Sequence, residues 1–186
     1  MKIKNKLVFG AIIILIVMGM ITGCATNSDK DKKSSYIDVL EAYFDALSDE
    51  NSKEIVECSF SKSLLKCLDV DREDVIAMYD EYYKDYHELQ DTQDGRWYKE
   101  YGNVDIVAKT KYTDDDIQSV MEDVEYYTGV EIDIDFDNMY ELQIKIDERT
   151  SSNPEWFVRE LTIIVYEIND EWYVFNTAAI NQLFQS

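Results

Sequence analysis

The spacing of apolar residues changes partway along this chain, and this change limits the folds that the chain can adopt. Between residues 36 and 90, apolar side chains recur every three or four positions, which is the period of helices buried on one face. From Asn103 onward they recur mostly at every second position, which is the period of strands. Helices followed by a series of strands predict an α+β fold, in which N-terminal helices pack on a curved antiparallel β-sheet.

Local signals divide the first part of the domain into three helices. Ser35 can cap the first helix, and Asn51 with Glu54 forms a capping box for the second. Asp71 with Asp74 marks the start of the third. One face of this third helix is unusually aromatic, and its tyrosines are Tyr79, Tyr82, Tyr83 and Tyr86. A tyrosine stripe at helical spacing usually belongs to the core, but it can also line a ligand pocket.

The second part of the chain is predicted to form strands with one inserted helix. Strands are expected around Trp97 and at residues 104–112, 140–147, 156–168 and 172–175. Asp94-Gly95 indicates a turn before them, and Asn169-Asp170 indicates a tight hairpin turn before the last one. The inserted helix covers residues 114–128, has Tyr127 on its apolar side and ends at Gly129. Because residues 156–168 are apolar on both faces, that strand is expected to be central.

The first 24 residues have the organisation of an export signal. Three lysines among the first six residues precede an uncharged, mostly apolar run over residues 7–21, which is shorter than the ~20 residues that a spanning helix needs. The run ends in Ile21-Thr22-Gly23-Cys24, which resembles the lipobox of bacterial lipoproteins. This resemblance implies that residues 1–23 are removed and that Cys24 receives acyl chains. An uncleaved signal anchor with an incidental cysteine is the alternative.

The lipobox resemblance, the composition and the chain length together predict three parts and a location. Residues 1–23 are expected to form the signal peptide, residues 24–35 a flexible polar tether, and residues 36–186 a single domain. Acyl chains on Cys24 would anchor the mature protein to the extracellular face of the cell membrane without a spanning helix.

The predicted mature chain is strongly acidic. Residues 1–23 contain three lysines and no acid, so their removal leaves 15 basic and 39 acidic residues, a net charge of about −24. Such a surface repels phosphate backbones, so we expect no nucleic-acid binding, and it attracts cations and basic proteins or peptides. Solubility alone is the simpler explanation of the charge. A content of 46% hydrophobic and 13% aromatic residues argues against disorder.

Two cysteines, Cys58 and Cys67, remain after Cys24. In an oxidising compartment such a pair can form a disulfide. The two residues lie nine positions apart on what is predicted to be one helix. A straight helix would separate them by about 13 Å, which is too far for a disulfide. We therefore expect two buried free thiols, unless the helix breaks near Ser61-Lys62-Ser63.

The sequence contains no recognisable catalytic or cofactor-binding motif. His87 is the only histidine, and it lies near the predicted end of the third helix with no nucleophile motif around it. Asp114-Asp115-Asp116 is interpreted as negative charge at a helix N-terminus. No glycine-rich phosphate loop and no zinc spacing occurs. We therefore expect no enzymatic activity and no cofactor.

One acidic stretch has part of the pattern of a calcium loop. Asp133, Asp135 and Asp137 have the spacing of the first three ligands of an EF-hand. The sixth position is Asn138 instead of glycine, and the twelfth is Ile144 instead of glutamate. These departures exclude the EF-hand loop and leave only weak cation binding, so we assign no metal site.

Two segments carry a wider resemblance. They are Tyr36-Ile37-Asp38-Val39-Leu40-Glu41-Ala42-Tyr43-Phe44-Asp45-Ala46-Leu47, followed by Asn51, and the closing Ile168-Asn169-Asp170-Glu171-Trp172-Tyr173-Val174. With the lipobox, they resemble the small cystatin-like or NTF2-like lipoproteins of Gram-positive bacteria. The resemblance implies a cone in which a bent sheet wraps a long helix, often with a pocket between them. The inserted helix at residues 114–128 departs from the minimal order of that family.

Three functions fit these observations. The first is a non-catalytic, membrane-anchored binding or accessory module with a basic protein or peptide as its partner. The second is a small-molecule-binding cone, which could be enzymatic, lined by Tyr79, Tyr82, Tyr83 and Tyr86. The third is a structural spacer in an envelope complex. The lack of a catalytic constellation favours the first.

Overall fold

The structure is a computed structural model that describes residues 35–90 and 97–184. The predicted signal peptide, Cys24, nearly all of the tether and the Asp94-Gly95 turn lie outside these residues. The helices are α1 (Tyr36–Ser48), α2 (Ser52–Ser59), α3 (Lys62–Leu68), α4 (Arg72–Gln90), α5 (Asp114–Thr128) and α6 (Thr177–Leu183). The strands are β1 (Lys99–Lys111), β2 (Asn138–Thr150), β3 (Asn153–Ile168) and β4 (Glu171–Val174).

The four strands form one antiparallel sheet in the order β1-β2-β3-β4. Strand β3 is central, as its apolar character on both faces predicts. Asn169 and Asp170 have φ values of 55° and 63°, which is the backbone of a two-residue hairpin turn that suits the twist of its strands. Strand β1 has two register shifts against β2, and such bulges bend a strand.

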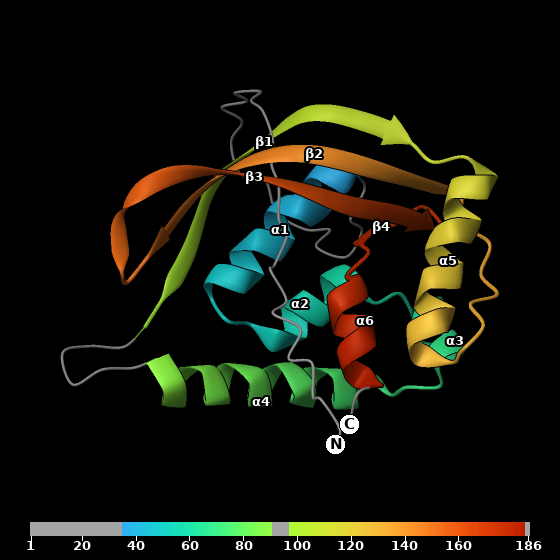
Figure 1. Cartoon of the computed structure of the whole chain (residues 1–186), viewed down its shortest axis with the longest axis horizontal. Helices are drawn as coiled ribbons and strands as arrows, with labels where there is room; N and C mark the ends of the chain where they lie inside the picture. Colours follow the sequence, from blue (N-terminus) through green and yellow to red (C-terminus); the bar gives the residue numbers. More distant parts are fainter. Residues whose placement is uncertain (1–34, 91–96, 185–186) are drawn as a thin grey trace, which may run out of the picture.

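The N-terminal helices pack against the sheet, which confirms the predicted α+β fold. Helix α1 runs along one face of the sheet and contacts β1 and β4 (Figure 1). Helix α2 contacts α1, and α4 forms an outer layer against α2. Helix α5 stands at one end of the sheet and contacts α6, whereas the β2–β3 hairpin extends to the other end.

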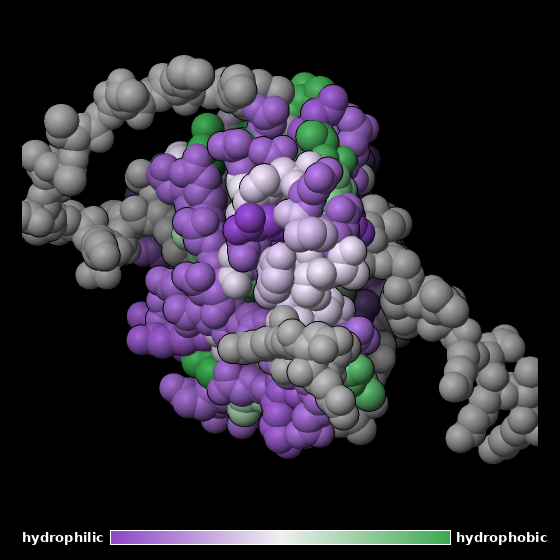
Figure 2. Space-filling view, turned by 90° about the vertical axis from the view of Figure 1, so that its left-hand side faces the viewer, coloured by the Kyte–Doolittle hydropathy of each residue, from purple (hydrophilic) through white to green (hydrophobic). Residues whose placement is uncertain are grey.

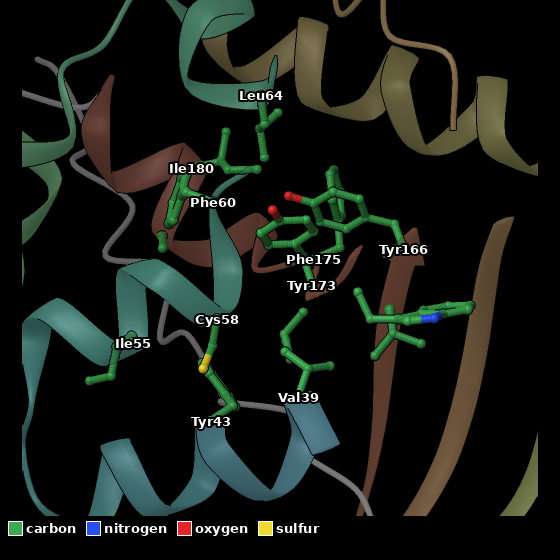
Figure 3. Packing of buried hydrophobic residues seen from close by; sticks show 14 of the residues in the cluster. Val39, Tyr43, Ile55, Cys58, Phe60, Leu64, Tyr166, Tyr173, Phe175 and Ile180 are labelled. Carbon is green, nitrogen blue, oxygen red and sulfur yellow. The ribbon is translucent and has the colours of Figure 1, made fainter. Parts of the chain in front are cut away.

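The hydrophobic core lies between the sheet and the helices. On β2, Leu142, Ile144 and Ile146 alternate with more exposed residues and are fully buried. Figure 3 shows the rings of Tyr166 and Tyr173 side by side, and their centroids lie 5.2 Å apart. Burial of each such side chain contributes about 1.5–3 kcal/mol to the stability of the folded state. This core therefore holds the two ends of the molecule in place.

The predicted second helix is in fact two helices, which corrects the prediction. Helix α2 ends at Ser59 and α3 begins at Lys62, where the Ser61 side chain accepts a hydrogen bond from the Leu64 N–H at 3.1 Å. The buried Tyr166 hydroxyl bridges the break, because it accepts from the Ser61 N–H and donates to the Ser59 carbonyl, both at 3.1 Å. These bonds satisfy backbone groups that a helix break leaves without helical partners.

Cys58 and Cys67 do not form a disulfide with each other, as expected, although they lie on separate helices. Cys58 is buried. Cys67 is only partly buried, so the prediction of two buried thiols is wrong for this residue. Its thiol donates to the Glu131 carbonyl at 3.4 Å, which places it at the surface between α3 and the segment after α5.

Two further predictions need correction. Trp97 does not belong to a separate short strand, because β1 begins at Lys99 and continues without interruption to Lys111. Tyr127 is 59% exposed instead of buried, and its ring contacts that of Tyr126 at a centroid distance of 5.2 Å. Helix α5 is covered on one side only, so its last turn leaves both rings in solvent.

Candidate functional site

The four tyrosines of the predicted pocket lie along α4 in different surroundings. Tyr79 is buried, Tyr82 is 47% exposed, and Tyr83 and Tyr86 are half-buried. The ring of Tyr86 contacts that of Trp97 at a centroid distance of 4.5 Å. Burial raises the pKa of Tyr79, Tyr82 and Tyr83 above the usual tyrosine value. That these four rings line a ligand pocket stays a prediction.

Asn176 explains why the deepest of these tyrosines is structural. Its Nδ2 donates to the hydroxyl groups of Tyr43 on α1 and Tyr79 on α4, each at 3.1 Å. Its Oδ1 accepts from the Ala179 N–H at 3.0 Å and so caps α6. One amide therefore joins three helices, and it holds the Tyr79 hydroxyl in a hydrogen bond within the fold.

One end of the molecule contains the β2–β3 hairpin, the start of β1 and the last turns of α4. We name these residues, 82–90, 97–102 and 147–159, the hairpin end (left in Figure 1). Figure 2 looks onto this end, where the described residues form a largely hydrophilic surface with a central area of intermediate hydropathy and a few small hydrophobic spots.

The hairpin end contains a buried carboxylate with two cations. Glu148 is 3% exposed, and its two oxygens lie 3.2 and 3.0 Å from Nη1 of Arg159. Nζ of Lys99 lies 3.4 Å from the same carboxylate. Burial lowers the pKa of Lys99, and Glu148 offsets part of this effect. Burial, and secondarily the charge of Glu148, raises the pKa of the neighbouring Tyr101.

His87 is also paired at this end. Its Nε2 lies 2.9 and 2.8 Å from the two carboxylate oxygens of Glu50, in the turn after α1. The two side chains are 15% and 18% exposed. Glu50 has a φ of 54°, a left-handed conformation that non-glycine residues rarely adopt. The only histidine of the chain therefore joins the end of α4 to the α1–α2 turn.

The opposite end carries acidic side chains without cationic partners. We name α5 and the extended segment 129–137 after it the acidic end (right in Figure 1). Residues 112–140 include ten acids and no lysine or arginine, and all ten acids are exposed. They are Asp114, Asp115, Asp116, Glu122, Asp123, Glu125, Glu131, Asp133, Asp135 and Asp137. Within residues 35–90 and 97–184, none of them forms an ion pair.

The segment after α5 is extended but belongs to no strand. Glu131, Asp133 and Asp135 alternate with inward apolar residues, of which Ile132 is 8% exposed. The ring of Phe136 packs edge-on against that of Tyr166 at 5.5 Å, which ties the segment to the core. Because side chains alternate in an extended chain, this packing turns every second residue, all of them acids, towards solvent.

The start of α5 agrees with the interpretation of its three aspartates as helix N-terminal charge. Thr113 and Asp116 form a capping box, in which the Thr113 hydroxyl and N–H donate to the Asp116 carboxylate at 2.7 and 2.8 Å. These hydrogen bonds lower the pKa of Asp116. A negative first turn suits the positive end of the helix dipole.

A pocket of about 480 Å³ opens at the acidic end. Asp133, Asp135 and Asp137 line it from one side, and Lys66 and Cys67 of α3 also line it. In the part of the chain that the structure describes, no three acidic, histidine or cysteine side chains are grouped closely enough to hold a metal ion. The aspartates with calcium-like spacing therefore share a pocket instead of a coordination shell.

Local sequence signals do not reveal this pocket, because its two sides are far apart along the chain. Cys67 and Glu131, which meet there, are 64 residues apart. Cys24 lies outside the described residues, so its lipidation stays a prediction. Among the residues that are described, no helix combines the length and the apolar character that a membrane span requires.

No protein-family model matches this chain, and no curated protein or solved structure matches it. The acidic end must therefore be interpreted from its own geometry.

Proposed function

We propose that this protein is a membrane-anchored, extracellular lipoprotein whose domain binds a basic protein or peptide at its acidic end without catalysing a reaction. The observation that carries this proposal is the group of ten exposed acids with no lysine or arginine between residues 112 and 140. Unpaired, exposed carboxylates add little to stability, but together they create a negative potential that steers a cationic partner.

The predicted anchor supports the same reading. Acyl chains on Cys24 would hold the domain near a membrane surface, where a negative domain is repelled by anionic head groups and remains in solution. The acidic end would then be available to proteins or peptides outside the membrane. The positions of His87 and Glu148 favour a non-catalytic role, since the His87 ring lies within hydrogen-bond distance of Glu50 and Glu148 forms an ion pair with Arg159.

The rate of association with a basic peptide tests this proposal. The full chain in neutral detergent micelles would be mixed with a capped peptide of four Gly-Lys repeats at several salt concentrations. We expect rapid association at low salt and a steep fall as the ionic strength rises. An association rate that does not depend on salt would contradict the proposal.

Matched variants locate the binding surface. One variant carries Glu131→Gln, Asp133→Asn and Asp135→Asn at the acidic end. Its control carries Glu81→Gln, Asp80→Asn and Asp85→Asn, three exposed acids of α4. Both variants lose the same charge, so only position differs. We expect the first to slow association about tenfold at low salt and the control to slow it much less. Equal effects would show that net charge, and not the acidic end, attracts the peptide.

A further inference from the structure

The pocket at the acidic end combines carboxylates with an apolar wall. Asp133 and Asp135 line it, together with Ile134 and Ile168. Asp137 also lines it, and its carboxylate accepts a hydrogen bond from the Asn169 N–H at 2.7 Å. This bond holds the segment against the β3–β4 turn, so Asp137 helps to fix the shape of the pocket, and Asp133 and Asp135 are left without a described ion pair.

We propose that this pocket receives one arginine side chain of the basic partner. The inference rests on the proposed function, because it names the group by which the partner is held. An arginine side chain has an apolar stem that can lie along Ile134, which is partly exposed. Its planar guanidinium carries five N–H donors, which suit two neighbouring carboxylates better than the compact ammonium of lysine does. A pocket of about 480 Å³ has room for such a side chain and for water around it.

Lys66 gives the pocket an opposing charge. It belongs to α3 and lines the pocket, whereas Lys62, one turn earlier on α3, does not. Both lysines are exposed. A cation that enters the pocket therefore experiences repulsion from Lys66, which disfavours a second cation and favours a single arginine. Lys66 limits the affinity of the site, and its removal should strengthen binding.

Cys67 provides a direct measure of occupancy. Its partly exposed thiol lines the pocket, while Cys58 is 1% exposed in the core. The full chain in neutral detergent would be treated with iodoacetamide, and the alkylation of each cysteine followed by mass spectrometry of its peptide. A capped peptide of four Gly-Arg repeats should slow the alkylation of Cys67 at least fivefold and leave Cys58 unreactive throughout. Unchanged alkylation of Cys67 at saturating peptide would overturn the proposal.

Substitutions distinguish binding in this pocket from attraction of the peptide by the net charge of the protein. Lys66→Met should tighten binding of the Gly-Arg peptide about threefold, and Lys62→Met, with the same charge change, should have a smaller effect. Ser63→Trp places a large side chain at the pocket wall without a change of charge and should weaken Gly-Arg binding about tenfold. Equal effects of the two lysine variants, together with no effect of Ser63→Trp, would reject the pocket.

The outcomes also distinguish the pocket from the proposed function. If the triple acidic-end variant slows association but Ser63→Trp does not weaken binding, the acidic end binds basic peptides and the pocket proposal fails. If neither has an effect, both proposals fail. A Gly-Lys peptide that binds and protects Cys67 as well as the Gly-Arg peptide would show that the pocket detects charge alone, and the assignment to arginine would be wrong.

Discussion

The two ends of this molecule use acidic side chains in opposite ways. At the hairpin end, Glu148 is buried between Arg159 and Lys99, and Glu50 is held by His87. At the acidic end, ten carboxylates are exposed and have no cationic partner among the described residues. The amino-acid composition does not distinguish these roles, because both ends contribute to the same large negative charge. Pairing and burial do distinguish them: the acids of the hairpin end are paired within the fold, and those of the acidic end are exposed, where we propose that they attract a partner.

The largest loss of stability is expected at high pH, where tyrosines in the core and at the hairpin end ionise. Eight tyrosines have raised pKa values in the folded state, mainly through burial. In the unfolded chain they ionise near pH 10, so the unfolded state releases protons first, and stability falls as pH rises above about 10. Tyr166, with a pKa raised to about 12, accounts for about 3 kcal/mol of this loss.

We therefore expect the protein to unfold cooperatively before the pH reaches 12. Below pH 10 the buried tyrosines remain protonated in both states and cause no loss of stability. Absorbance of tyrosinate at 295 nm and far-ultraviolet circular dichroism would follow ionisation and unfolding together. Gradual ionisation to pH 12 without loss of secondary structure would show that these rings are more accessible than the structure indicates.

The next largest effect is expected from Glu148→Gln. The substitution keeps the shape of the side chain but leaves Arg159 and Lys99 without their shared counter-charge. Because breaking a buried ion pair is costly, we expect the free energy of unfolding to fall by about 3 kcal/mol in a urea titration. The control is Glu160→Gln, which removes a 70% exposed partner of Lys145 and should change stability by less than about 1 kcal/mol. Similar effects of both variants would contradict a special role for the buried carboxylate.

A somewhat smaller effect is expected from Tyr166→Phe. It removes the hydroxyl that accepts from the Ser61 N–H and donates to the Ser59 carbonyl, and so leaves two buried backbone groups without a partner. We expect a loss of about 2 kcal/mol in the same titration. Tyr126→Phe is the control, since that residue is 83% exposed and should have almost no effect. An unchanged stability of the Tyr166→Phe variant would mean that other groups form hydrogen bonds with the Ser61 N–H and the Ser59 carbonyl.

The smallest effect on stability is expected at the acidic end. The triple variant Glu131→Gln, Asp133→Asn and Asp135→Asn should alter the free energy of unfolding by about 0.5 kcal/mol or less, because exposed residues without partners rarely contribute more. Relief of repulsion between neighbouring carboxylates would make the change stabilising. A large loss of stability would show that these acids belong to the fold and would weaken the division between the two ends.

Much of the fold follows from short-range sequence signals. Ser35 and Asn51 each accept the N-cap hydrogen bond that their positions predict. Gly129 adopts the left-handed conformation that ends α5. These signals act within a few residues, so one sequence is enough to recognise them.

Features that depend on distant residues could not be predicted in this way. The break between α2 and α3 is satisfied by Tyr166, which lies 105 residues after Ser61. The pocket forms only because α3 meets the segment 133–137. Asp133, Asp135 and Asp137 suggested a cation site from their spacing, but Lys66 and Cys67 on the other side gave no local signal. The sequence therefore indicated the acidic character of the site and missed its cavity.

The amide of Asn176 has a consequence for the order in which the protein can complete its structure. It binds Tyr43, which lies 133 residues earlier, and Tyr79, which lies 97 residues earlier. Contacts of such high sequence separation carry a large loop-closure cost, and these two cannot form until residue 176 has been synthesised. If the predicted export signal directs the chain through a channel that accepts only unfolded polypeptides, early folding would block its transport. A fold that depends on Asn176 would remain incomplete, and the chain competent for such transport, until residue 176 has been synthesised.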